Sequence, residues 1–149
     1  MIKLGLTSIG DLLVNNRITT LKDDDTTHNI KLEIPEYQRP YKWTAKNANQ
    51  LLDDILEAKN SNKEVYRVGT LILNKDGNKY NIVDGQQRTI TFSLLLKCLE
   101  PETEIKFLDQ PLQNNENNAF NVSTNYKTLV RRIDKIPDTD SLYDYVCTN

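Results

Sequence analysis

A short segment that is apolar on almost every side places the strongest constraint on how this chain folds. Residues 89–99 read TITFSLLLKCL, and their apolar positions are Ile90, Phe92, Leu94, Leu95, Leu96, Cys98 and Leu99. On a helix these side chains point in nearly all directions, and a helix that is hydrophobic all round has to be buried. The sequence therefore predicts a central, buried helix over residues 89–99.

A second helix is predicted over residues 45–60. Thr44 precedes this stretch, and threonine is a residue type that caps helix N-termini. The apolar residues that follow recur with the helical period and fall on one face, namely Ala48, Leu51, Leu52, Ile55 and Ala58. This pattern is typical of an amphipathic helix that packs one face against a core.

Three segments show the signals of strands. In IKLEIP, apolar residues alternate with charged ones, which predicts a half-buried strand over residues 30–34 that Pro35 ends. The runs VYRVGTLIL and KYNIV flank NKDGN, and an Asp-Gly pair between two apolar runs is a strong hairpin signal. We therefore expect a β-hairpin over residues 65–83.

The N-terminal segments are shorter and more polar. Thr7 or Ser8 is expected to cap a short helix that presents three apolar side chains to the core, Ile9, Leu12 and Leu13. The sequence KDDDTTHN at residues 22–29 is predicted to be a polar loop.

The C-terminal segments begin with an Asn-rich stretch. LQNNENNAFNVSTN at residues 112–125 favours a long surface loop or an insertion. Ser123 or Thr124 is expected to cap a following helix, YKTLVRRIDKI, and Ser141 is expected to start a last helix, SLYDYV.

The chain is long enough for one domain with a real core. It has 149 residues, of which 38% are hydrophobic. The predicted elements combine into an α+β fold, with a small mixed sheet that contains a β-hairpin and with packed helices. We assign residues 1–105 to this core. Residues 106–149 are assigned to the Asn-rich loop and the C-terminal helices, as the start of a truncated helical region.

The overall charge excludes a general attraction to polyanions. The formal net charge is −2 and the sequence pI is about 5.4, so no global field draws the chain onto DNA or an anionic membrane. Lys127, Arg131 and Arg132 form the only dense basic spot, which is typical of a solvated helix face. Contact with nucleic acid would need a local patch or another part of a longer protein.

The sequence predicts a cytoplasmic protein without a metal site. No apolar run is long enough to span a membrane, and the N-terminus lacks the basic flank and apolar core of a signal peptide. Cys98 and Cys147 have no CxxC spacing, and His28 is the single histidine. This composition disfavours both a disulfide scaffold and a zinc site.

The stretch IVDGQQR joins the second strand of the hairpin to the central helix. The first N–H groups of a helix have no partner within it and attract anions. Gly85 permits a positive φ, Gln86 and Gln87 carry amide donors, and Arg88 carries a guanidinium fork. Together with Asp84 these residues outline a phosphate site, called here the DGQQR corner. The alternative is an ordinary turn in which Arg88 pairs with a surface carboxylate, and the sequence leaves both open.

A second polar and aromatic cluster, EYQRPYKW, precedes the amphipathic helix. Pro40 favours an extended conformation before it, so that Tyr37, Arg39 and Tyr41 would project to the same side. Aromatic rings beside an arginine can stack on a base while the arginine binds its phosphate. For Tyr37 and Trp43, anchoring in the core is an equally good interpretation.

Together, IPEYQRPYKW and IVDGQQRTITFSLLL resemble the N-terminal domain family of GmrSD-type restriction endonucleases, over roughly residues 5 to 100. The resemblance implies a ParB/sulfiredoxin-like fold whose DGQQR corner binds nucleotide phosphates, with NTP hydrolysis in several members. It also implies a sensor module of modification-dependent restriction or phage-defence proteins, in which nucleotide turnover is coupled to the cutting of modified DNA.

The resemblance also assigns roles to residues. Asp84, Gly85, Gln86, Gln87 and Arg88 match one motif, and the upstream motif is matched by Tyr37, Gln38, Arg39, Tyr41 and Trp43. We expect phosphate binding by the corner residues together with Arg39, Gln38 and Tyr41. Arg88 and Asp84 are the candidate catalytic residues, with ATP or GTP and Mg²⁺ as ligands. After Arg88, family members commonly read Leu-Thr-Thr-Leu, whereas this chain reads TITF.

Some chemistry of related proteins is missing from the sequence. Members often carry a C-terminal HNH nuclease domain, which needs histidine, and His28 alone cannot supply such a site. The corner has no thiol, which excludes sulfiredoxin chemistry there. We therefore expect an NTPase or sensor part rather than a nuclease, with DNA and a nuclease domain or subunit reached through the full-length protein. The alternative is a non-catalytic ParB-like module that binds DNA or docks a partner.

Overall fold

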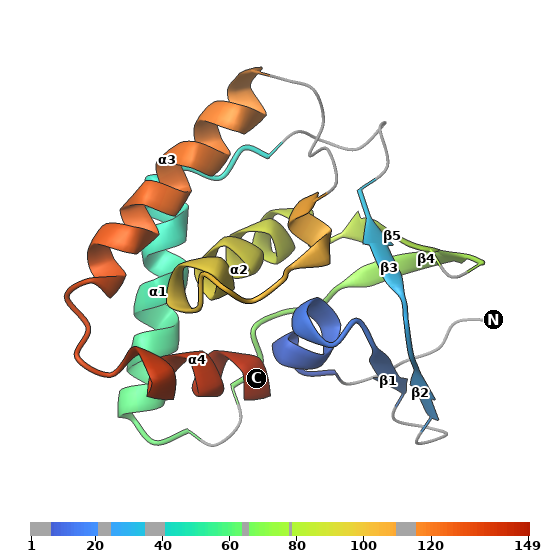
Figure 1. The fold of residues 1–149 in the computed structure, drawn as a ribbon, viewed down its shortest axis with the longest axis horizontal. Coiled ribbons are helices and arrows are strands. Elements are labelled where there is room, and N and C mark those ends of the chain that lie inside the picture. The colour runs from blue at the N-terminus through green and yellow to red at the C-terminus, as the bar shows by residue number, and fades with distance from the viewer. Residues whose placement is uncertain (1–6, 21–24, 35–40, 64–65, 78, 110–115) are drawn as a thin grey trace.

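The computed structural model describes residues 7–20, 25–34, 41–63, 66–77, 79–109 and 116–149. Its elements, in chain order, are η1 (Gly10–Val14), β1 (Ile18–Thr20), β2 (Asp25–Thr27), β3 (Lys31–Glu33), α1 (Ala45–Asn60), β4 (Ile72–Asp76), β5 (Lys79–Asp84), α2 (Gln86–Leu99), η2 (Lys106–Asp109), α3 (Glu116–Ile133) and α4 (Thr139–Thr148). Figure 1 shows the sheet on one side of α2 and the helices α1, α3 and α4 on the other. The predicted α+β class is therefore confirmed, with a mixed sheet, a hairpin and packed helices.

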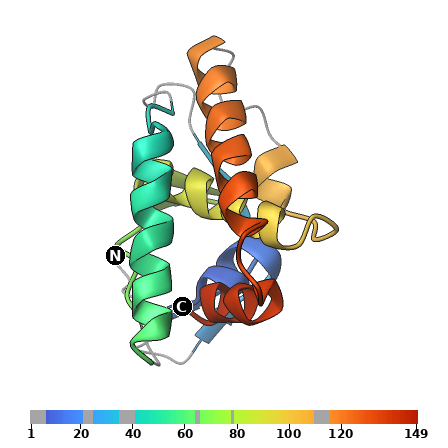
Figure 2. The ribbon, with the colours of Figure 1, turned by 90° about the vertical axis from the view of Figure 1, so that its left-hand side faces the viewer.

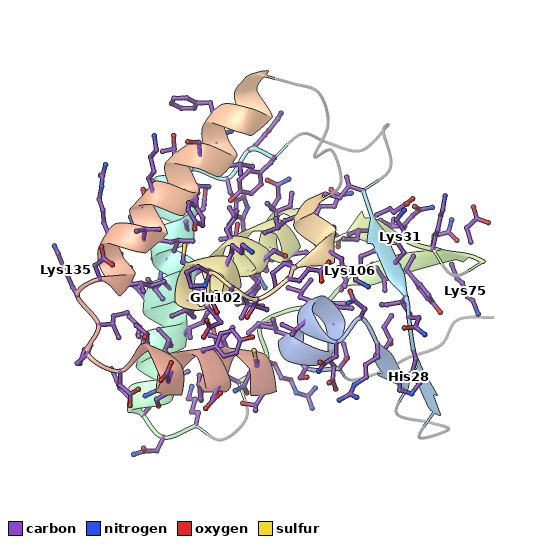
Figure 3. All side chains as sticks on the ribbon, in the orientation of Figure 1. His28, Lys31, Lys75, Glu102, Lys106 and Lys135 are labelled. Carbon is purple, nitrogen blue, oxygen red and sulfur yellow. The ribbon has the colours of Figure 1, made fainter. Side chains whose placement is uncertain are left out.

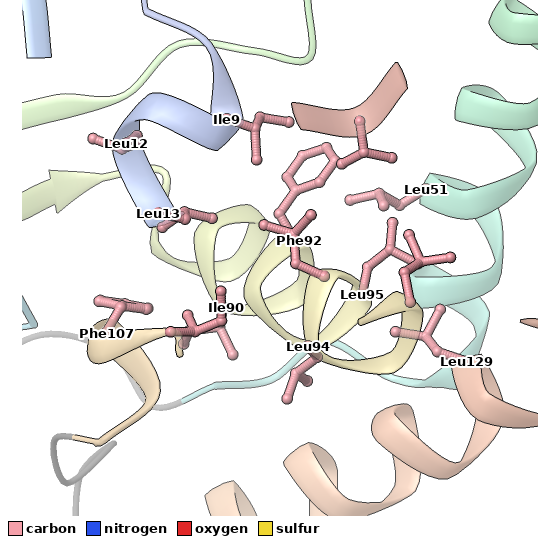
Figure 4. Packing of buried hydrophobic residues seen from close by; sticks show 14 of the residues in the cluster. Ile9, Leu12, Leu13, Leu51, Ile90, Phe92, Leu94, Leu95, Phe107 and Leu129 are labelled. Atoms are coloured by element: carbon pink, nitrogen blue, oxygen red, sulfur yellow. The ribbon is translucent and has the colours of Figure 1, made fainter. Parts of the chain in front are cut away.

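The helix α2 lies at the centre of the core, as the apolar segment predicts. The helix contacts α3, α4 and η2, and its side chains share one core cluster with residues of η1 and α1; Figure 4 shows Phe92 and Leu95 within this cluster. Leu95 is fully buried, with an exposed fraction of 0%. The helix begins at Gln86, three residues before the predicted start. Gly85 is the N-cap, and its carbonyl accepts the N–H of Thr89 at 3.1 Å, so Gln86 to Arg88 form the first turn.

The helix α1 forms as predicted over Ala45–Asn60, with Thr44 as its N-cap. The side chain of Asn47 reaches back, and its Oδ1 accepts the Thr44 N–H at 3.0 Å. All five apolar residues of the predicted face are buried: Ala48, Leu51, Leu52, Ile55 and Ala58. The amphipathic pattern thus determined both the helix and the face that it buries.

The sheet has the strand order β3-β5-β4. The strands β4 and β5 form an antiparallel hairpin as predicted, but its first strand begins at Ile72, and residues 66–71, expected to belong to it, are in no strand. The strand β3 adds to β5 in parallel, with Leu32 opposite Tyr80. Ile82 of β5 is fully buried and faces the core. Because β5 continues directly into α2, the hairpin fixes where the DGQQR corner lies.

A separate two-stranded pair, β1 and β2, corrects one prediction. Residues 22–29 were expected to be a loop, but Asp25–Thr27 pairs antiparallel with Ile18–Thr20. The strand β2 has no apolar alternation, so its pairing depends on backbone hydrogen bonds that sequence periodicity does not report. In the preceding η1, Ser8 Oγ accepts the Asp11 N–H at 3.1 Å, and the predicted apolar residues are buried: Ile9, Leu12 and Leu13.

The Asn-rich loop is the largest wrong prediction. The helix α3 begins at Glu116, so that Ser123 and Thr124, the expected caps, lie in its interior. Asparagine is a weak helix former, but Asn121 and Asn125 make tertiary hydrogen bonds that offset its low helix propensity. The last helix, α4, is capped by Asp138 rather than started by Ser141, whose N–H donates to Asp138 Oδ1 at 3.0 Å.

The helices α3 and α1 lie side by side, as Figure 2 shows. Arg132 joins them: its guanidinium lies 2.6 Å from Asp53 Oδ1 and donates to the Asn49 carbonyl at 3.1 Å. The basic spot is thus not a simple solvated face, since only Lys127 and Arg131 are exposed. No helix in the described ranges is both long and apolar enough to span a membrane.

Candidate functional site

The DGQQR corner is a sharp turn between β5 and α2. Gly85 has φ +99° and ψ +12°, in the left-handed region that favours glycine. Its N–H donates to Asp84 Oδ1 at 3.0 Å, and its carbonyl also accepts Thr89 Oγ1–H at 2.8 Å. The sequence prediction of a positive φ at Gly85 is confirmed.

The corner packs tightly against the chain that precedes the hairpin. A Cβ on Gly85 would lie 2.9 Å from Leu71 Cδ1 and 3.1 Å from the Thr70 carbonyl oxygen. Both distances are below ordinary van der Waals contact. The absence of a side chain at Gly85 therefore lets residues 70–71 approach the start of α2.

Arg88 is exposed on the first turn of α2, and the structure gives it a defined partner. Its Nη1 donates to the Val68 carbonyl at 2.5 Å. Gly69, with φ +145°, leaves room for this contact, because a Cβ there would clash with the guanidinium. A carbonyl oxygen thus orients Arg88 without neutralising its charge, and this bond uses only one of the five N–H donors of the guanidinium.

The two glutamines of the corner differ in position. Gln86 is only 7% exposed, and its Nε2 donates to the Ile82 carbonyl at 3.0 Å, so its side chain braces the turn from inside. Gln87 turns toward the segment before α1, where its Oε1 accepts the N–H groups of Lys42 at 2.8 Å and Trp43 at 3.2 Å. Both side chains hold the corner together in this structure.

Tyr41 is a core residue here, with an exposed fraction of 1%. Its hydroxyl lies 2.8 Å from Thr91 Oγ1 and 2.7 Å from Asn125 Nδ2. Burial raises the pKa of the phenol, against the opposing effect of these hydrogen bonds. The structure places this side chain inside the core, with its hydroxyl bonded to buried groups. The other upstream predictions, Gln38 and Arg39, lie outside the described residues, as does Tyr37.

Two further cations belong to segments whose backbone contacts the corner. Arg67 precedes Val68, whose carbonyl binds Arg88, and the backbone N–H of Lys42 donates to Gln87. Arg88, Arg67 and Lys42 are exposed, and none forms an ion pair within the described parts of the chain. Asp84 is an exposed carboxylate whose Oδ1 accepts the Gly85 N–H. The alternative in which Arg88 pairs with a carboxylate is not what the described structure shows.

Other groups with catalytic chemistry lie elsewhere. His28 is exposed beside β2, and Figure 3 shows it away from the helices. Among the described side chains, no group of three or more His, Cys, Asp or Glu residues is arranged to hold a metal ion.

The asparagines of α3 were not among the residues that the sequence predicted for the site. Asn121 Nδ2 donates to the Tyr41 carbonyl at 2.9 Å, and Asn125 Nδ2 donates to the Trp43 carbonyl at 2.8 Å. The two residues are four apart and face the same way on a helix. This spacing was the available signal, and it is hidden in a stretch whose composition favours a loop.

Cys98, in the last turn of α2, is expected to be unreactive in the folded chain. Burial raises the pKa of its thiol to about 12, and its Sγ lies 3.7 Å from the Tyr126 carbonyl oxygen. Since the thiolate is the nucleophile, its reaction with a disulfide reagent at pH 8 should be about a hundredfold slower than in the urea-unfolded chain. A Cys147→Ser variant isolates the signal of Cys98. Equal rates in the folded and unfolded chains would contradict the burial.

Comparisons with known proteins support the resemblance drawn from the motifs. The family model described as "GmrSD restriction endonuclease, N-terminal domain" matches residues 13–146, well beyond the span of 5 to 100 suggested by the motifs. Neither a search of curated proteins nor a search of solved structures finds a match. The family match covers most of the chain, including α3 and most of α4. This chain therefore belongs to the GmrSD restriction endonuclease N-terminal domain family and is part of a restriction-system protein.

Proposed function

We propose that the DGQQR corner binds the phosphates of a nucleoside triphosphate. The observation that carries this proposal is the exposed guanidinium of Arg88 on the first turn of α2, which donates to the Val68 carbonyl and forms no ion pair among the described residues. It lies at the helix N-terminus, where the helix dipole favours an anion. Lys42 and Arg67, two exposed cations, lie in the segments whose backbone contacts Gln87 and Arg88.

The roles of the residues follow from their positions. Arg88 would bind the phosphate oxygens by charge-assisted hydrogen bonds and stabilise charge that develops during transfer. Asp84, the exposed carboxylate of the corner, offers the kind of oxygen ligand that Mg²⁺ prefers. Gln86 and Gln87 would hold the backbone of the corner, as their hydrogen bonds to Ile82, Lys42 and Trp43 indicate. Hydrolysis would be slow, because no general base stands out among the described residues near Arg88.

Within a longer restriction protein, such a module would act as a sensor. We infer that nucleotide binding, and turnover where it occurs, would be coupled to DNA modified by a host or phage. Contact with that DNA, and cutting by a nuclease domain or partner subunit, would be contributed by the full-length protein. The family membership supports this assignment.

A thermal-shift titration with ATP and GTP, each with and without Mg²⁺, tests the proposal. A nucleotide at about one hundred times its dissociation constant should stabilise the folded chain by roughly 2.7 kcal/mol. Replacing Arg88 by alanine should abolish the shift, since it removes the charge and the fork that bind phosphate. Lys75→Ala, which removes an exposed cation from β4, is the matched control and should leave the shift unchanged.

The outcomes separate the two classes of function. A shift with one nucleotide that is lost in Arg88→Ala and kept in Lys75→Ala supports the nucleotide site. No shift with any nucleotide, from a chain that unfolds cooperatively, would overturn it. That result would favour the alternative function, a module that binds DNA phosphates or docks a partner.

A further inference from the structure

The backbone of residues 41–43 belongs to no helix or strand, yet side-chain amides pair with most of its polar groups. Asn121 donates to the Tyr41 carbonyl at 2.9 Å, and Asn125 donates to the Trp43 carbonyl at 2.8 Å. Gln87 Oε1 accepts the N–H groups of Lys42 and Trp43. We call Gln87, Asn121 and Asn125 the three-amide clamp. It connects α2 and α3 through a segment that neither helix contains.

A buried chain of hydrogen bonds reinforces the clamp, and its direction can be assigned. The Trp43 carbonyl can only accept, so the Asn125 atom facing it is the NH₂ group, which also donates to the Tyr41 hydroxyl at 2.7 Å. Thr91 Oγ1 donates its proton to the backbone carbonyl of Gln87 at 2.8 Å. It must therefore accept in its other hydrogen bond, so the Tyr41 O–H donates to Thr91. This series of hydrogen bonds thus runs from α3 to the first turn of α2, where the DGQQR corner lies.

We propose that Asn121 and Asn125 are positioning residues for the DGQQR corner, and that the corner takes its binding geometry only when α3 is seated on residues 41–43. This inference rests on the proposed function, because it assigns a regulating element to the same anion site. Lys42 lies in the clamped segment, and its backbone N–H binds Gln87, a side chain of the corner. Displacement of α3 would release this segment and with it the hydrogen bonds that hold Gln87, the residue before Arg88.

The burial of the clamp separates it from ordinary surface hydrogen bonding. Asn125 is fully buried, with an exposed fraction of 0%, and Thr91 has the same burial. Polar groups in such surroundings interact strongly and have few alternative partners. Loss of the Asn125 amide donor therefore leaves the buried Trp43 carbonyl without this partner and removes one of the two hydrogen bonds of the Tyr41 hydroxyl. We expect the segment to shift rather than remain in place.

Trp43 offers a direct readout, because it is the only tryptophan of the chain and both its N–H and its carbonyl are held by the clamp. Asn125→Asp removes the amide donors without a change in size, and Asn121→Ala removes the other donor at a half-buried position. Both should shift Trp43 emission to longer wavelength and increase its quenching by acrylamide. Ser123→Ala, at an exposed position on the same helix, should do neither.

The second measurement is the affinity for ATP or GTP with Mg²⁺, using whichever nucleotide stabilises the wild-type chain. We expect binding to weaken roughly tenfold in Asn121→Ala, the loss that about one hydrogen bond of positioning corresponds to. Far-UV circular dichroism and a cooperative melt establish that each variant is folded. Asn121→Ala keeps the test valid if Asn125→Asp does not fold.

The outcomes are distinct. Increased quenching together with weaker binding supports the proposal. Increased quenching with unchanged affinity would show a merely structural clamp and overturn the positioning role, as would unchanged quenching in both variants. If the wild-type chain binds no nucleotide, the proposed function fails, while the quenching data still decide whether α3 holds residues 41–43.

Discussion

Leu95→Ala is expected to lower the free energy of unfolding by about 2–5 kcal/mol, which is the usual cost of removing a buried leucine side chain. Leu95 is fully buried on α2 and lies toward α1 and α3 in the core, as Figure 4 shows. The surrounding helices can relax only partly, so the substitution leaves a cavity as well as losing apolar burial. Urea denaturation followed by circular dichroism measures this change.

Leu73→Ala provides the matched control for Leu95. Leu73 is a leucine of the edge strand β4 and is only half-buried. Its truncation removes the same atoms but less buried contact, so the loss should be clearly smaller. Equal losses at the two positions would show that α2 is not the centre of the core.

Gly85→Ala is expected to destabilise the fold by about 2–6 kcal/mol, because two costs add. An L-residue at φ +99° is strained, which costs about 1–3 kcal/mol. Its Cβ would also lie 2.9 Å from Leu71 Cδ1, and overpacking of this kind costs a further 1–3 kcal/mol or so. The same substitution should weaken nucleotide stabilisation in the thermal-shift assay, since residues 70–71 and the start of α2 can no longer approach each other.

Gly77→Ala separates the two costs. Gly77 lies in the hairpin turn with φ +65°, and a Cβ there would meet no atom within 4 Å. This variant therefore carries the conformational cost alone, about 1–2 kcal/mol. If Gly77→Ala is as destabilising as Gly85→Ala, the close packing of the corner against Leu71 does not contribute to the loss of stability in Gly85→Ala.

The glycines also explain how Arg88 comes to be oriented. Gly85 lets the preceding chain approach α2, and Gly69 leaves space for the guanidinium at the Val68 carbonyl. The corner is thus built from β5, the first turn of α2 and residues 68–71. The DGQQR motif identifies the first two parts but contains no information on the third.

Local patterns were sufficient wherever one periodicity dominates. The helix α1, the hairpin of β4 and β5, and the buried character of α2 were all predicted, because apolar spacing and an Asp-Gly turn act over a few residues. Over residues 116–125, the described part of the Asn-rich stretch, the prediction of a loop was wrong for the opposite reason. Asparagine favours loops locally, but Asn121 and Asn125 find partners on residues 41 and 43, about eighty positions away.

In the candidate site, too, some features follow from the sequence motif and others do not. The positive φ of Gly85 and the place of Arg88 at a helix start follow from the motif, and both are confirmed. The burial of Gln86 and Tyr41 did not follow from it, since a polar side chain in a motif looks the same whether it faces a ligand or the core. Phosphate binding, NTP hydrolysis and the ParB/sulfiredoxin-like identity of the fold stay predictions.

The sequence by itself determined which segments are helices and strands with strong periodicity, where the chain turns from β5 into α2, and the family to which it belongs. The tertiary structure alone decided which polar side chains point outward at the corner and which join the three-amide clamp. The physical reason is that a buried amide or hydroxyl must find a partner, and here the partners come from segments far apart in the chain. Such pairings depend on how helices pack, which no local pattern records.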